Sequence, residues 1–120
     1  MPFKAIMRNL VDSVPGARGA IFVDWEGEAV DQYSVVDDDV YELKVMGAHK
    51  GVILSQINEA QKTADNAEIN MVIIRMDKYS IILAPVKEGY YVALEVKAGA
   101  IMSRATYLIK QSVKDLAANM

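Results

Sequence analysis

The segment at residues 14–34 constrains the fold more than any other part of the chain. It reads VPGARGAIFVDWEGEAVDQYS, with an apolar run at 19–25, a turn at 25–28 and a more polar run at 29–36. Two short runs around a glycine-containing turn predict a β-hairpin. Helical patterns lie on both sides of this segment, so the hairpin connects two helices in a mixed α+β fold.

Three stretches of the chain have the periodicity of a helix. Residues 3–14 place apolar side chains on one face, and Pro15 with Gly16 ends this helix. The second helix is long, from 40 to about 63, and a capping box of Asp39 and Glu42 marks its start. Residues 101–118 form the third helix, which is amphipathic.

Three strands, at 68–76, 79–86 and 90–97, lie between the second and third helices. The turns between them are too short for anything but antiparallel neighbours. The predicted order is αββαβββα in a single domain of residues 1–120. A sheet of apolar strands needs cover on both faces, so we expect the long helix on one face and the two terminal helices on the other.

Composition excludes several classes of protein. A net charge of −3 argues against nucleic acid as the main partner, because phosphate binding needs a concentrated basic face. Without cysteine there is no disulfide, thiolate nucleophile or cysteine zinc site. The longest apolar runs are far shorter than the roughly 20 residues that span a bilayer. The amphipathic N-terminus does not read as a secretory signal, and we expect a cytoplasmic protein that does not insert into membranes.

The long helix carries apolar side chains on two faces. One face fits a helix packed on a sheet, and a second, smaller stripe lies nearly opposite. Because one sheet needs only one apolar face, the second stripe predicts an interface, although small apolar patches also occur on monomers. The predicted interface residues on this helix are Tyr41, Val45, Ala48, His49, Val52 and Gln56.

The strand at 68–76 supports the same interface. Ile69, Met71 and Ile73 alternate with Val72 and Ile74, so both faces of this strand are apolar. An apolar strand at a sheet edge is an aggregation risk unless another chain pairs with it. We therefore predict a homodimer through this strand and the long helix, with Ile69, Met71 and Ile73 at the interface.

No catalytic motif stands out. The acidic cluster Asp37–Asp39 with Glu42 is explained by helix capping rather than by a metal site, and His49 has no second histidine nearby. The chain has neither a Gly-x-Ser-x-Gly elbow nor a phosphate-binding loop. We expect no enzymatic activity, no metal and no cofactor. Two positions are compatible with Trp25 at the hairpin tip. Its side chain either contacts a partner or folds back over the first helix.

The order of elements resembles the Roadblock family of dynein light chains and their prokaryotic relatives. The local match begins at 15–20 with PGARGA, continues through the strand IFVD at 21–24 and ends at Glu26-Gly27. Weaker matches are Gly47-Ala48 and the stretch ILAPV at 82–86 followed by GYY at 89–91. The resemblance implies a five-stranded antiparallel sheet of the profilin and longin type. The helix before the first strand favours the Roadblock order over the longin order.

The resemblance also implies a function. Family members form homodimers by joining sheets edge to edge and pairing the long helices. Bacterial members are partners of small Ras-like GTPases, and one, a gliding-motility protein, accelerates GTP hydrolysis without supplying an arginine finger. The expected function is a non-catalytic regulator or scaffold that binds a small GTPase. The alternative is an adaptor that links larger assemblies without nucleotide-dependent binding.

Overall fold

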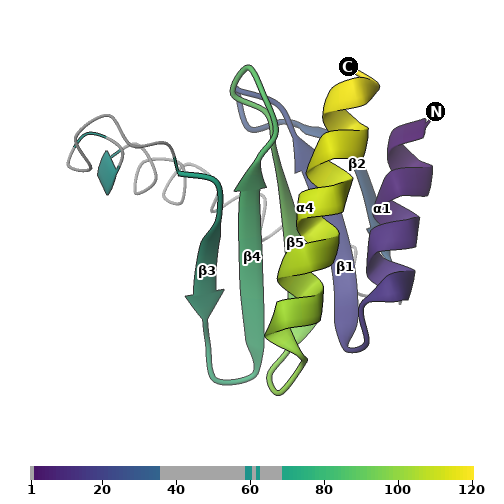
Figure 1. Ribbon diagram of the computed structural model, residues 1–120, viewed down its shortest axis with the longest axis vertical. Helices are drawn as coiled ribbons and strands as arrows, with labels where there is room; N and C mark the ends of the chain where they lie inside the picture. The colour runs from purple at the N-terminus through teal and green to yellow at the C-terminus, as the bar shows by residue number, and fades with distance from the viewer. Residues whose placement is uncertain (1, 36–58, 61, 63–68) are drawn as a thin grey trace.

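The computed structural model describes residues 2–35, 59–60, 62 and 69–120. The described strands form one five-stranded sheet in the order β2-β1-β5-β4-β3, and every neighbouring pair is antiparallel (Figure 1). The elements are α1 (Pro2–Ser13), β1 (Ala17–Val23), β2 (Ala29–Ser34), β3 (Val72–Arg75), β4 (Tyr79–Pro85), β5 (Tyr91–Lys97) and α4 (Met102–Ala118).

The hairpin predicted at 14–34 is present as β1 and β2. Its turn is held by Asp24, whose Oδ1 accepts hydrogen bonds from the backbone N–H groups of Glu26 and Glu28, both at 2.9 Å. Gly27 has φ +84°, a conformation that costs glycine little. The local sequence DWEGE therefore sets the turn, as the glycine between two strand patterns indicates.

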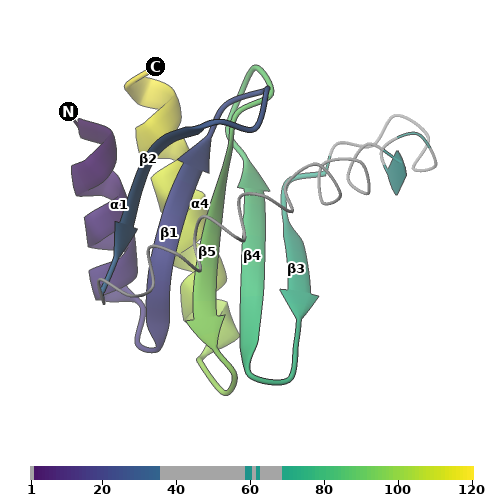
Figure 2. The same ribbon diagram turned by 180° about the vertical axis from the view of Figure 1, so that it is seen from behind.

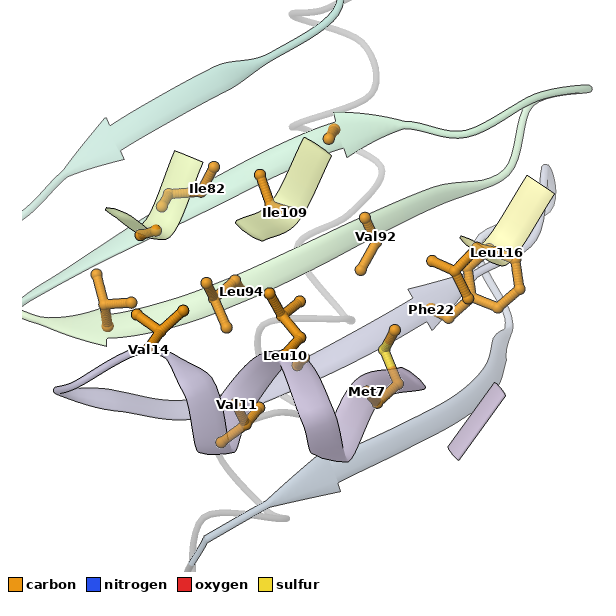
Figure 3. Packing of buried hydrophobic residues seen from close by; sticks show 14 residues of the cluster. Met7, Leu10, Val11, Val14, Phe22, Ile82, Val92, Leu94, Ile109 and Leu116 are labelled. Carbon is orange, nitrogen blue, oxygen red and sulfur yellow. The ribbon is translucent and has the colours of Figure 1, made fainter. Parts of the chain in front are cut away.

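The terminal helices α1 and α4 lie side by side on one face of the sheet (Figures 1 and 2). Their apolar stripes meet inward-pointing side chains of β1, β4 and β5, and this packing makes the main core (Figure 3). The placement of both terminal helices on one face agrees with the expectation from the sequence. The fully buried large side chains of this core are Met7, Leu10, Phe22, Ile82, Val92, Leu94, Val96, Ile109 and Leu116.

The opposite face of the sheet carries a second cluster of buried side chains. Its members are Ile21, Val23, Ile81, Leu83, Tyr91 and Ala93. Successive residues of a strand point to opposite faces, so β1, β4 and β5 are buried on both sides. This explains why their sequences are continuous apolar runs rather than alternating ones.

The strand predicted at 68–76 is shorter than expected, because β3 spans only Val72–Arg75. The register pairs Val72 with Leu83, and two residues further it would place Asn70 opposite Pro85. Met76 donates its N–H to Tyr79 O at 2.9 Å, so these two residues form a hydrogen-bonded pair. Such pairs recur at every second residue of an antiparallel ladder, and Asn70 with Pro85 would therefore be another one. Proline has no N–H to donate, so the ladder stops.

The predicted long helix at 40–63 and its capping residues Asp39 and Glu42 lie mostly outside the described residues. Within that range, Glu59, Ala60 and Lys62 have helical backbone. Among the described helices, none is both long enough and apolar enough to cross a membrane.

Candidate functional site

The most unusual surface in the described part of the chain is the free edge of β3. This strand pairs with β4 on one side and ends the sheet on the other. Its sequence, VIIR, is almost entirely apolar, and Ile73 is 38% exposed. An apolar strand edge in contact with water favours pairing with another chain.

The backbone of β3 presents hydrogen-bonding groups to this edge at every second residue. Met76 donates its N–H to Tyr79 O across the turn, so Ile74 and Val72 face β4 with their N–H and C=O groups. Ile73 and Arg75 then direct their N–H and C=O groups away from the sheet. The free edge therefore offers the pattern that an added antiparallel strand requires.

The side chains of β3 divide between the two faces of the sheet. Val72 and Ile74 pack against the second cluster, while Ile73 pairs with Ile82 on the face covered by α4. The predicted interface residues before the strand do not share a face. Met71 packs against the main core, whereas Ile69 packs against the second cluster.

The expectation of one alternating stripe from Ile69 to Ile73 is therefore wrong at Ile69. The alternation holds from Met71 onward and fails before it, close to the end of the ladder with β4 at Val72.

The other edge of the sheet differs in character. Strand β2 reads AVDQYS and carries Asp31, which lies 3.6 Å from the Lys4 ammonium of α1. Polar and charged side chains at an edge discourage pairing with another chain. Of the two edges in the described sheet, β3 is the one suited to pairing.

The predicted interface residues on the long helix lie outside the described residues. They are Tyr41, Val45, Ala48, His49, Val52 and Gln56. The acidic cluster at 37–39 and Glu42 lie outside as well. Within the described ranges, no group of three or more histidine or acidic side chains is placed to hold a metal ion.

A buried ion pair on the second face of the sheet was not predicted. Arg18 on β1 donates from Nη1 to Glu95 Oε1 on β5 at 2.9 Å, and both side chains are largely buried. The Arg18 guanidinium also lies 4.2 Å from the ring centroid of Tyr79 on β4. The one available signal was Glu95 itself, a carboxylate within the apolar run of β5.

Tyr91 lies near the hairpin turn on the same face. Burial of the phenol, with the Asp24 carboxylate as a smaller cause, raises the pKa of Tyr91 to about 12. Both causes disfavour the charged phenolate. Tyr91 therefore stays neutral at physiological pH and acts as a packing residue rather than as a base.

Trp25 does not return over the first helix. Its indole is 59% exposed and lies 5.7 Å from the ring of Tyr90, measured between centroids. Gly89 makes this approach possible, since a Cβ there would lie 2.8 Å from the Cβ of Trp25. Of the two readings from the sequence, the folded-back one is wrong.

The family of the chain follows from its sequence match. Residues 5–96 match the model of the Roadblock/LC7 domain. The chain belongs to the Roadblock/LC7 family. The resemblance seen at residues 15–27 is confirmed by this match, which extends from α1 through most of β5.

Solved structures show the same Roadblock/LC7 fold. MglB from Myxococcus xanthus superposes with a TM-score of 0.86 at 12% identity, covering 98% of this chain and 94% of that one. A Roadblock/LC7 domain from Streptomyces avermitilis gives 0.82 at 16% identity, with 97% and 95% covered.

A more distant neighbour confirms the predicted profilin-like architecture. The profilin LokiProfilin1, solved in complex with rabbit actin, gives a TM-score of 0.60 at 13% identity, with 99% and 96% covered. At these identities the likeness of all three structures concerns the fold. Among curated proteins, no match to this Roadblock/LC7 chain is found.

Proposed function

We propose that this chain is a homodimeric, non-catalytic module that binds a small Ras-like GTPase and modulates its nucleotide cycle in the cytoplasm. The family match and the MglB-like fold support the class of module. The observation that carries the dimer is the apolar free edge of β3, with Ile73 exposed and outward backbone groups at Ile73 and Arg75.

In the proposed dimer, the β3 strands of two copies pair antiparallel across a two-fold axis. The two sheets then become one, and the stripe of Tyr41, Val45, Ala48 and Val52 packs against its copy. A stable dimer of ordinary size buries roughly 800 Å² per subunit. A four-residue edge strand alone is too small for that area, so the proposal requires the helix stripe as well.

The proposed regulation works by positioning rather than by an inserted arginine. Arg18 is held by Glu95 and Tyr79 inside the fold, so it is not available to reach a partner's nucleotide. Arg8 lies 3.6 Å from Asp12, and Arg104 donates its Nε–H to Ser13 O. The burial of Arg18 supports a mode in which the module arranges the catalytic groups of the GTPase itself.

The GTPase proposal is tested by binding to Ras-like GTPases from the same genome, each loaded with GTP or with GDP. We expect at least one to bind in a way that depends on the nucleotide. Equal binding in both states, or none, would favour the adaptor alternative. The dimer is tested separately by light scattering, in which Val45→Asp with Val52→Asp should give a monomer.

A further inference from the structure

A groove lies beside α4, and none of the residues that line it is among those of the proposed dimer interface. Its volume is about 440 Å³, and it runs between α4 and the β3–β4 side of the sheet. Asn70 and Pro85 line it at the point where the β3–β4 ladder stops. The groove is built by a single chain, so it does not depend on the dimer.

The floor and wall of the groove are largely apolar. Ala84 and Pro85 contribute from β4, and Tyr107 and Val113 from α4. Tyr107 is 62% exposed, and Ile73 is exposed on the same face of the neighbouring strand. Large apolar side chains beside a concave surface favour a partner that brings apolar side chains of its own.

Among the described residues, the helices on this face do not extend as far as β3. Figure 1 shows α1 and α4 side by side in front of the sheet, with no described helix in front of β3. Packed helices lie about 8–10 Å apart, and strands about 4.8 Å apart. A further helix beside α4 would therefore lie on the side of α4 that faces the end of β4, where the groove is.

The charge of the groove is positive. Lys110 and Lys114 both line it, and among the described lining residues none is acidic. They are one helical turn apart, about 6 Å along the axis. Helix α4 carries three basic residues and one acidic residue, while the whole chain has a net charge of −3. An acidic partner is therefore attracted to this side of an otherwise acidic molecule.

We infer that this groove binds an acidic amphipathic helix of a partner protein. The helix lies beside α4 on this face of the sheet, with its apolar stripe on Ala84, Pro85 and Val113. Carboxylates one turn apart on its flank face Lys110 and Lys114. A lipid surface fits less well, because a bilayer is flat and the apolar side chains lie in a concave groove.

The test is a selection from a displayed library of 16-residue peptides on the full-length protein. We expect the selected peptides to combine apolar residues at helical spacing with two or more Asp or Glu side chains one turn apart. Amide NMR shifts on binding should concentrate at Tyr107, Lys110, Val113 and Lys114. Selected peptides that are basic, or that shift residues elsewhere, would overturn the inference.

A charge reversal makes the test specific. Lys110→Glu with Lys114→Glu should weaken the selected peptides about tenfold or more, since two attractions become repulsions. A peptide whose two carboxylates are replaced by lysine should regain affinity for that variant. The matched control is Lys78→Glu with Lys97→Glu, which makes the same charge change at exposed positions away from the groove.

Two further outcomes would contradict the inference. One is an equal loss of affinity in the groove variant and in the control, which would indicate net charge rather than a site. The other is sedimentation of the protein with phosphatidylserine vesicles that is lost in the groove variant, together with no peptide selected. That result would assign the lysines to a membrane surface.

Discussion

At the scale of single residues, the Arg18–Glu95 pair joins strands that are distant in sequence. Its partners are 77 positions apart and 2.9 Å apart in space. Arg18→Met removes the guanidinium that pairs with the buried Glu95 carboxylate, and we expect a loss of about 3 kcal/mol in the free energy of unfolding, measured by urea denaturation.

The double variant Arg18→Met with Glu95→Gln is the control for this prediction. It removes both charges, so most of the lost stability should return. If the single variant is as stable as the native chain, the pair contributes nothing and the prediction fails.

Tyr91 gives the fold a dependence on alkaline pH. The unfolded chain releases the phenol proton near pH 10, while the folded chain keeps it until the pKa of about 12. Between these values the unfolded state binds fewer protons, so stability falls as pH rises. Tyr91→Phe removes this effect and should gain about 1 kcal/mol relative to the native chain between pH 8 and pH 11. Urea unfolding of both proteins checks it, and parallel pH profiles would contradict it.

At the scale of elements, Pro85 decides where β3 begins. Odd-numbered residues of β4 direct their N–H groups toward β3, since Val86 donates to Tyr90 O on the side of β5. Pro85→Val supplies the missing donor, and we expect β3 to extend to Asn70. Hydrogen exchange checks this, because the new amide at position 85 should be protected. Fast exchange there would show that something other than the proline ends the ladder.

The sequence predicts elements well where one pattern covers a whole element. In α1 and α4 the apolar stripe indicates which face of the helix is buried. In β1, β4 and β5 the continuous apolar run indicates burial on both faces of the strand. The sequence did not predict the early end of β3, because that depends on Asn70 meeting Pro85, and the register of two strands sets that meeting. The Arg18–Glu95 ion pair was not predicted for a similar reason. Neither residue alone indicates whether its charge is buried and paired, because the partner lies on another strand.

At the scale of the whole molecule, the proposed dimer can be tested by removing a single backbone N–H group from the edge of β3. Ile73→Pro removes an N–H that points away from β4, so the fold should remain while strand pairing between copies is lost. Light scattering should then give the mass of a monomer. Ile73→Val, which keeps the N–H, should behave as the native chain. A dimer that survives Ile73→Pro would exclude pairing at β3.

The two edges of the sheet differ, and that difference limits how far the molecules can assemble. If β2 were as apolar as β3, the β3 edge of one copy could add to the β2 edge of the next, and each addition would leave a fresh edge. Such head-to-tail growth produces open filaments. Asp31 and its neighbours make β2 unsuited to this role. In the proposed dimer, pairing of β3 with β3 would use both apolar edges at once, so growth through strand edges would stop at two subunits.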